Sequence, residues 1–496
     1  MKKNLFSLLI FCACCRLGAQ NRYLEPVFDQ VKVTHDLVYA KNATVETIPL
    51  TGQAIPVDLL FDFYEPEGDT ATTRPVVIVV HRGDYLYYLQ GSCLPWYQDS
   101  LPIELCTRLA RMGYAVAAID IRTGWSPLDP LYAKRVATWI NAYYRSIQDL
   151  RTAVRFFKKT AAEDANPFRI DTAKIVVWGE NTGGMTVLGA SYANSFPDWV
   201  NPAMMIAPGG MPAVLESVNG NIEGSSYGVV PPNYWLFPAG DTLCYPNWPG
   251  YSSHFQMAVS LAGAIPNLPW VDPGEPPALL FHAFSDAYIP CNTGLWVPQY
   301  APFAFELTGS CTLAPILESS GCNQVFEGLG LSDPISQQAS LYNNGHDGFY
   351  PFTGLSPESA EPWYWGTPCM AIQNVNTDGA TARLYLDTVI AYFAPRACAV
   401  LNLNCSGSST IGGPSAAPRF FISPNPATET ITMNLAEGAN PGPYSIRILN
   451  AQGEQVLQAA RYYPGKEIDI KNWPSGYYVI IFTDDIHTMG GKFVKH

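Results

Sequence analysis

The sequence predicts an α/β protein built on a mainly parallel, doubly wound sheet and followed by a small all-β sandwich. Between about residues 57 and 397, apolar β-branched runs alternate with helical patterns, as in βαβ units whose strands are buried on both faces. The 78 residues from position 419 instead show short alternating strands separated by turn signals. A length of 496 residues suits two or three such units.

The chain begins with a segment typical of a secretory signal peptide. Lys2 and Lys3 precede an apolar stretch, and Leu17-Gly18-Ala19 offers the small residues that suit cleavage. We therefore expect residues 1–19 to be removed on export. No transmembrane segment is expected, because no apolar run approaches the roughly 20 residues that cross a bilayer.

The elements of the main unit follow in order. Alternating apolar residues between Leu37 and Tyr64 predict an opening antiparallel pair of strands. A long helical pattern closes the unit near Ala397. Between these ends, buried strands are expected at 74–80, 115–121, 174–179, 201–210 and 276–284, and helices at 100–114, 143–161 and 381–397.

Two segments depart from this alternation. Residues from about 211 to 269 are rich in Gly, Pro, Asn and Trp and follow no regular period, which predicts a lid insertion. Residues 399–418 are rich in Gly, Ser and Pro and predict a linker. The expected domains are therefore 20–398, including the insertion, and 419–496.

Charge and cysteine content limit the partners and the environment. A formal net charge of -13 disfavours nucleic acid as a partner, because phosphate binding needs a basic surface. Nine cysteines lie after the leader, and their spacing predicts disulfides Cys311–Cys322 and Cys398–Cys405, with buried free thiols as the alternative. The spacing of Cys and His residues predicts no metal site, and nothing in the sequence implies a cofactor.

The C-terminal 78 residues closely resemble a known export signal. The matching residues are Pro424-Asn425-Pro426, Leu449 to Gly453, Pro474 to Tyr477 and Lys492-Phe493-Val494. This pattern resembles the type A C-terminal sorting domain of the Bacteroidota type IX secretion system. The resemblance implies that residues 419–496 engage that machinery and that the protein is secreted or held at the cell surface. A carbohydrate-binding β-module is the alternative.

The stretch KIVVWGENTGG, ending at Gly184, predicts a sharp turn between a buried strand and a helix. With the surrounding pattern, it resembles the α/β-hydrolase fold of secreted carboxylesterases and feruloyl esterases, whose nucleophilic serine sits in such a turn. Asn181 stands at that position. Asparagine tolerates a positive φ, but its carboxamide nitrogen has a delocalised lone pair and is no nucleophile. Conversion of Asn181 to aspartate is disfavoured, because the β-branched Thr182 hinders succinimide formation.

The same resemblance supplies the remaining catalytic positions. Asp286 follows an apolar strand, as the acid of the family does, with a turn or capping role as the alternative. His346 is the only histidine between Asp286 and the end of the domain, and its Gly-flanked loop before the last helix matches the family's base. The loop HRGDY, residues 81–85, stands where the oxyanion loop would be, which leaves the amides of Gly83 and Thr182 as candidate donors.

In that loop Arg82 and Asp84 replace glycines of the family pattern, so the amide of Gly83 is the only unhindered donor expected there. The alternative is that Arg82 and Asp84 form a surface ion pair. A literal G-x-S-x-G occurs around Ser226, but Pro231 and Pro232 exclude the helix that should follow it.

We therefore expect an exported, esterase-like protein that has lost serine-esterase chemistry and binds a ligand, such as a small-molecule or carbohydrate-linked ester. The alternatives are an active ester hydrolase that uses another nucleophile or activated water, and a purely structural surface protein.

Overall fold

The computed structural model describes residues 22–86, 96–201, 205–207, 210–266, 268–297, 304–365, 378–403, 405, 420–435, 443–450, 455–483 and 488–496. The expected signal peptide and most of the expected linker lie outside these residues. Cys93 and Cys369 also lie outside them.

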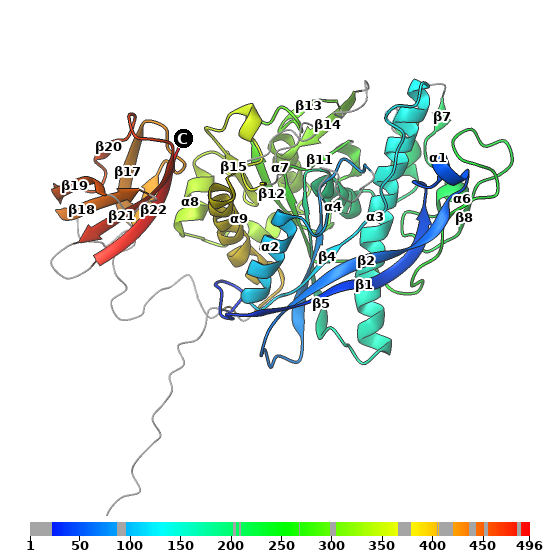
Figure 1. Cartoon of the computed structure of the whole chain (residues 1–496), viewed down its shortest axis with the longest axis horizontal. Helices are drawn as coiled ribbons and strands as arrows, with labels where there is room; N and C mark the ends of the chain where they lie inside the picture. The colour runs from blue at the N-terminus through cyan, green and yellow to red at the C-terminus, as the bar shows by residue number, and fades with distance from the viewer. Residues whose placement is uncertain are drawn as a thin grey trace, which may run out of the picture.

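An eight-stranded sheet forms the centre of the main unit (Figure 1), in the order β1-β2-β4-β3-β5-β10-β12-β15. The pairs from β4 to β15 are parallel and the opening pair β1–β2 is antiparallel, as the sequence predicts. The pair β2–β4 is also antiparallel. The strands are β1 (Val31–Thr44), β2 (Ile55–Pro66), β3 (Arg74–Val80), β4 (Ala115–Ile119), β5 (Ile170–Glu180), β10 (Met257–Leu261), β12 (Ala278–Ala283) and β15 (Phe349–Phe352).

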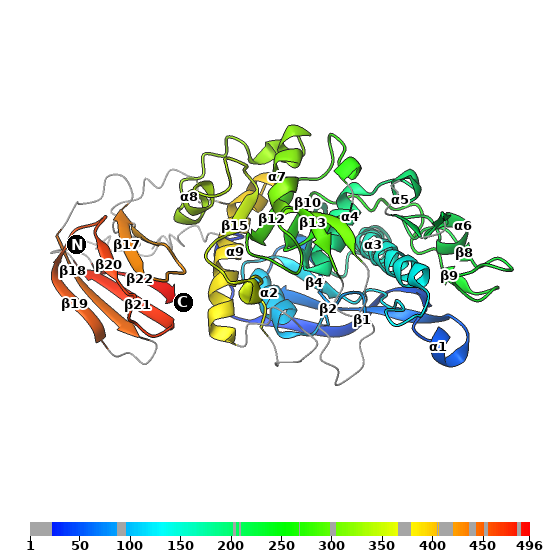
Figure 2. The ribbon, with the colours of Figure 1, turned by 90° about the horizontal axis from the view of Figure 1, so that it is seen from above.

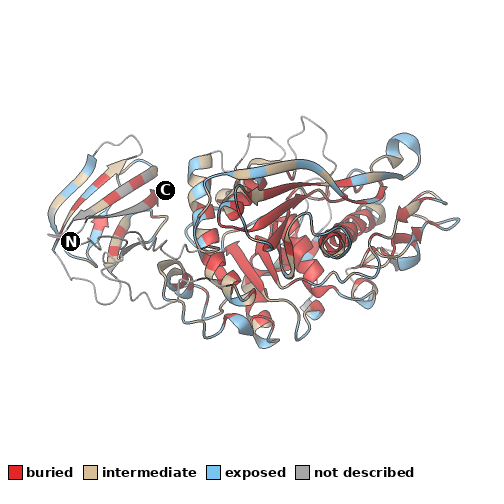
Figure 3. Cartoon of the chain, turned by 90° about the horizontal axis from the view of Figure 1, so that it is seen from below, coloured by how far each residue is buried: buried red, intermediate tan, exposed pale blue. Residues whose placement is uncertain are grey.

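Helices cover both faces of this sheet (Figure 2). Along β3, Val76, Ile78 and Val80 pack into one hydrophobic core with α3 and α4, and Val77 and Val79 pack into a second core with α2 and α9. Alternate residues of a strand point to opposite faces, so a strand covered on both sides is expected to be apolar on both. The strands β3, β4, β10 and β12 are buried along their length (Figure 3). These helices are α2 (Ser100–Arg111), α3 (Tyr132–Glu163), α4 (Thr182–Tyr192) and α9 (Gly379–Val400).

Shorter helices and strands lie outside the central sheet, and three of these strands form a second sheet in the order β11-β14-β13. The short helices are α1 (Ile48–Thr51), α5 (Pro197–Val200), α6 (Glu216–Asn219), α7 (Ser310–Ser319) and α8 (Pro334–Ser340), with 3-10 turns η2 (Leu268–Trp270), η3 (Gln324–Phe326) and η4 (Pro357–Ser359). The short strands are β6 (Ile206–Ala207), β7 (Met211–Pro212), β8 (Gly228–Val229), β9 (Thr242–Cys244), β11 (Ala264–Ile265), β13 (Thr293–Trp296) and β14 (Phe305–Gly309).

The chain leaves the central sheet between α4 and β10, and this segment, here called the excursion, differs from the expected lid insertion at residues 211–269. β10 lies inside that range but is an inner strand of the central sheet, between β5 and β12. The strand expected at 201–210 is instead β6, which pairs with β7 outside the central sheet. The chain therefore leaves the sheet after α4 and returns at β10, because the five buried residues of β10 supply the apolar strand that the sheet needs there.

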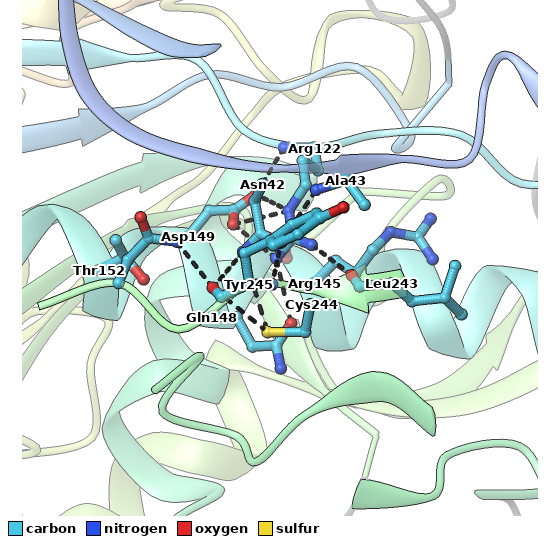
Figure 4. A network of polar contacts seen from close by, with 12 residues as sticks. Asn42, Ala43, Arg122, Arg145, Gln148, Asp149, Thr152, Leu243, Cys244 and Tyr245 are labelled. Atoms are coloured by element: carbon cyan, nitrogen blue, oxygen red, sulfur yellow. Dashed lines mark hydrogen bonds and ion pairs between the residues drawn. The ribbon is translucent and has the colours of Figure 1, made fainter. Parts of the chain in front are cut away.

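A buried polar network ties this excursion to the sheet and to α3 (Figure 4). Arg122, in the loop after β4, pairs with Asp149 of α3 at 2.7 Å and donates to the carbonyl of Leu243 in β9 at 3.1 Å. Asn42 of β1 accepts from the amide of Tyr245 at 2.9 Å. Because Arg122 and Asp149 are almost fully buried, this pair is shielded from solvent, and the excursion is fixed to the body at this point.

The disulfides confirm one predicted pair and correct the other. Cys398–Cys405 is bonded, as predicted. The predicted pair Cys311–Cys322 is wrong, because Cys311 bonds Cys291, which the turn after β12 brings within a Cα–Cα distance of 5.1 Å. Cys322 is a buried free thiol, as are Cys106 and Cys244.

The C-terminal unit consists of two antiparallel sheets with a hydrophobic core of their own, as the sequence predicts. Their orders are β16-β17-β20 and β19-β18-β21-β22. The strands are β16 (Phe420–Ser423), β17 (Thr430–Leu435), β18 (Tyr444–Asn450), β19 (Gln455–Tyr462), β20 (Glu467–Asp469), β21 (Gly476–Thr483) and β22 (Thr488–Lys495).

Among the helices that the structure describes, none combines the length and the apolar character that a membrane crossing requires.

Candidate functional site

A sharp turn places Asn181 at the carboxyl edge of the central sheet, between β5 and α4. Its φ of 55° and ψ of -118° lie in a region that most side chains avoid. Two glycines make the turn possible, because a Cβ on Gly179 would stand 2.0 Å from the carbonyl oxygen of Gly183, and a Cβ on Gly183 would stand 2.4 Å from that of Val80. The expected elbow between strand and helix is therefore present.

Both polar atoms of the Asn181 carboxamide form hydrogen bonds, and the residue is fully buried. Its Oδ1 accepts from the amide of Thr182 at 2.8 Å, which caps α4. Its Nδ2 donates to Oε1 of Glu361 at 2.5 Å. The side chain is thus held as a hydrogen-bonded bridge between the start of α4 and a carboxylate.

Glu361 lies in the loop between β15 and α9, the last helix of the body, and is fully buried. Its Oε2 accepts from Nη1 of Arg82 at 2.5 Å. The resemblance places the family's base in the loop before the last helix, so Glu361 occupies the region where a histidine was expected. Sequence reasoning missed it because an isolated glutamate carries no motif.

Arg82 links Glu361 to a second buried glutamate. The same Nη1 donates to Oε1 of Glu180 at 3.0 Å, and the guanidinium lies over the ring of Tyr364 at 4.4 Å. Arg82 therefore pairs with two interior carboxylates and does not form the surface ion pair considered for it with Asp84. Asp84 instead accepts from the hydroxyl of Tyr288 at 2.5 Å.

Burial controls the protonation of these carboxylates. It raises the pKa of Glu180 to about 8, and repulsion from Glu361 adds to the rise, while the charge of Arg82 opposes it. Burial likewise raises the pKa of Glu361 and of Asp84. Arg82 is thus the cation beside three acids, Glu180, Glu361 and Asp84, whose pKa values are raised by burial.

The expected oxyanion donors lie beside the turn, but one of them is already used. The Thr182 amide donates to Oδ1 of Asn181, so a substrate oxygen would have to displace that contact. Gly83 follows β3 and adopts a φ of 146°. The next amide, of Asp84, donates to Oγ1 of Thr182 at 3.1 Å, which joins this loop to α4.

Asp286 lies at the carboxyl end of β12, on the same edge of the sheet as Asn181, and its charge contributes to the raised pKa of Glu361. Its Oδ1 accepts from the amides of Tyr288 and Ile289, at 2.8 Å and 3.0 Å. Its Oδ2 lies 3.4 Å from Nε2 of His282, a buried histidine that also contacts Ser310. Asp286 therefore has the turn role that was the alternative for it, and its charge also acts on Glu361.

His346 is not brought to Asn181. It precedes β15, and β15 runs parallel to β12, so His346 lies at the amino edge of the sheet while Asp286 and Glu361 follow the carboxyl ends. Its Nδ1 contacts the carboxylate of Glu318 on α7. The physical reason is the four-residue strand Phe349–Phe352, which separates His346 from the loop that contains Glu361.

Ser226 has a structural contact, since its Oγ accepts from the amide of Asn221 at 2.8 Å within a loop before β8. Among the described residues, no group of three or more His, Cys, Asp or Glu residues is arranged to hold a metal ion.

Two family models match the sequence. The model described as BD-FAE matches residues 61–200, which include the elbow, and the model of the secretion system C-terminal sorting domain matches residues 422–496. No curated protein sequence matches the chain.

Solved structures of esterases resemble the body. A thermophilic esterase from the Planctomycetes species Thermogutta terrifontis is 15% identical with a TM-score of 0.34, and the match covers 74% of this chain and 92% of that chain. A truncated carbohydrate esterase from gut microbiota is 14% identical with a TM-score of 0.28, over 54% of this chain and 82% of that chain. The assignment of the fold rests on the strand order of the central sheet and on the matched family model.

Proposed function

Because the chain is an esterase-like α/β-hydrolase-fold protein with a C-terminal type IX secretion sorting domain, we propose that it is exported, lacks serine-esterase chemistry and acts by binding a ligand. The observation that carries this proposal is the closed network Asn181–Glu361–Arg82–Glu180. Its polar groups bind one another at the place where an esterase needs a free nucleophile and base.

Three parts of the network argue against acyl transfer. The carboxamide of Asn181 has no nucleophilic oxygen with a transferable proton. The group that contacts it is the carboxylate of Glu361, which is paired with Arg82. The Thr182 amide, the best-placed oxyanion donor, is already bonded to Asn181.

The ligand we propose is a small-molecule or carbohydrate-linked ester, held at the carboxyl edge of the sheet. The match to the BD-FAE model supports an ester-like ligand. Phe284, directly after β12, is 47% exposed at this edge and offers an apolar surface beside Asp286.

The alternative, hydrolysis by activated water, is favoured by one observation. Burial moves the pKa of Glu361 upward, toward the range in which a general base works at neutral pH. In that case Glu361 would take a proton from water, and no covalent intermediate would form.

Short-chain aryl esters distinguish these functions. We expect the purified protein to show no turnover above the uncatalysed rate, and Asn181→Ser alone to gain none, because among the described residues no histidine bonds to the side chain at position 181 and could accept the serine proton. Wild-type turnover that is lost in Glu361→Gln and kept in His346→Ala would establish the water mechanism instead. Turnover lost in His346→Ala would restore His346 as the base.

Ligand binding has its own measurement. We expect at least one member of a panel of sugar and phenolic-acid esters to raise the melting temperature of the wild-type protein, since a ligand that binds only the folded state stabilises it. A panel without any shift would favour a purely structural surface protein.

A further inference from the structure

Two Asn-Gly pairs occur in the body, Asn344-Gly345 in the loop before β15 and Asn219-Gly220 at the end of α6. At such a pair, the backbone nitrogen of the glycine can attack the side-chain carbonyl carbon of the asparagine. Glycine permits this attack because it has no Cβ to crowd the ring that forms. The local sequence therefore favours the reaction at both positions, and the folded structure decides which asparagine can react.

Asn344 lies at the exposed tip of its loop, and Gly345 is exposed beside it. Within the described part of the chain, the Asn344 side chain forms no hydrogen bond. Its φ of 56° is the left-handed conformation, which asparagine tolerates in turns. A Cβ on Gly345 would meet no atom within 4 Å, so there is room around the attacking nitrogen. The Asn344 carboxamide can therefore rotate toward the backbone of Gly345.

Asn219 is held in place by its surroundings. It is 2% exposed, its Oδ1 accepts from the amide of Leu215 at 3.0 Å, and its Nδ2 donates to Asn141 of α3. The amide of Gly220 donates to the carbonyl of Glu216 at 2.9 Å. The same reaction at Asn219 would have to break these three contacts inside the folded protein.

One contact restrains the attack on Asn344. The amide of Gly345 donates to Oδ1 of Asn343 at 3.0 Å, and this nitrogen must lose its proton as it attacks. Asn343 is 3% exposed and is itself held, because its Nδ2 donates to the carbonyls of His346 at 3.0 Å and Phe349 at 3.3 Å. The reaction at Asn344 is therefore expected to be slower in the folded protein than in the unfolded chain.

We propose that Asn344 is a site of spontaneous deamidation, which gives the exported protein a second charge form. The Gly345 nitrogen forms a bond to Cγ of Asn344 and the bond from Cγ to Nδ2 breaks, so that ammonia leaves with the amide proton and a succinimide remains. Water then opens this ring at either carbonyl and gives aspartate or isoaspartate. The product adds a negative charge to the loop in which His346 contacts Glu318.

Peptide mass spectrometry of the full-length chain compares the two asparagines after incubation at neutral pH. In the folded protein, we expect aspartate and isoaspartate to form at Asn344 at least about tenfold faster than at Asn219. In guanidinium chloride, the two positions should convert at similar rates, and Asn344 should convert faster than in the folded protein. No conversion of Asn344, or equal conversion of the two positions in the folded protein, would overturn the proposal.

Two variants check the assignment by anion-exchange chromatography. Asn344→Asp contains the aspartate product and should co-elute with one of the forms that accumulate in the wild-type protein. Asn344→Gln keeps the carboxamide, but its longer side chain would have to close a larger ring, so we expect the new charge forms not to appear. Charge forms that accumulate as fast in Asn344→Gln as in the wild-type protein would place the modification at another residue and overturn this site.

Discussion

The protonation of single buried acids makes the stability of this protein depend on pH. The pKa of Glu180 is raised to about 8 in the folded state, from an ordinary value of 4.5. Between these values the folded state keeps a proton that the unfolded state has lost, so the free energy of unfolding falls as pH rises from about 5 to about 8. One fully linked group contributes about 1.4 kcal/mol per pH unit.

Urea unfolding at pH 5.5, 7.0 and 8.5 measures this dependence. In Glu180→Gln, the part of the slope that Glu180 contributes is lost, and the remaining slope reports the other acids whose pKa is raised by burial, among them Glu361, Asp84 and Asp120. Glu67→Gln, on the exposed surface, is the control and should keep the wild-type slope. A stability that rises over this pH range would contradict the assignment.

Single residues also show how far the sequence can predict the site. Asn181 and Asp286 were found because a strand pattern and turn residues mark their positions. Glu361 was not, because its role depends on Arg82, which lies 279 positions earlier in the chain, and no local signal joins the two. His346 was chosen because it is the only histidine between Asp286 and the end of the domain, and the structure places it at the other edge of the sheet, in contact with Glu318.

At the scale of elements, the turn from β5 into α4 has little tolerance for added volume. Alanine at position 183, in α4, would place its Cβ 2.4 Å from the carbonyl oxygen of Val80, and β3 cannot move away without disturbing its pairing with β4 and β5. We expect Gly183→Ala to lower the free energy of unfolding by about 3 kcal/mol or more. Gly52→Ala is the control: its φ of 77° is strained but its surroundings are open, so about 1 kcal/mol is expected.

The buried ion pair of Arg122 and Asp149 is one of the contacts beside the excursion between α4 and β10, and its contribution can be tested. Asp149→Asn leaves Arg122 buried with a neutral partner, and we expect the free energy of unfolding to fall by about 3–5 kcal/mol. The exposed pair of Lys41 and Asp58 supplies the control, because Asp58→Asn should cost at most about 1 kcal/mol. A loss in Asp149→Asn as small as the loss expected for Asp58→Asn would show that the network in Figure 4 adds little stability.

Helices and strands were predictable where the length of a segment and its hydrophobic periodicity indicated the same type of element, as for β3, β5 and α3. β10 was missed because its five residues, four of them apolar, lie near the end of a Gly- and Pro-rich segment whose composition obscured the run. β15 was missed because FYPF is short and contains Pro351, a residue unusual within a strand. The unrecognised β15 is also why His346 was assigned to the wrong edge of the sheet.

At the scale of the whole molecule, the two units have separate cores and separate tasks. The sorting domain directs export by the type IX secretion system to the cell surface or the extracellular space. A chain that ends before residue 422 is therefore expected to accumulate in the periplasm, as measured by fractionation and immunoblotting. Equal release of the full and shortened chains would contradict this role of the sorting domain.

The mutual pairing of Asn181, Glu361 and Arg82 also constrains the descent of this protein. Serine at position 181 would remove a partner of Glu361, and histidine at position 361 would leave Arg82 short of a counter-charge. Each of these substitutions made alone is therefore expected to lower the free energy of unfolding. A serine–histidine pair at these positions would need both changes together, so the network makes the single steps toward it unfavourable.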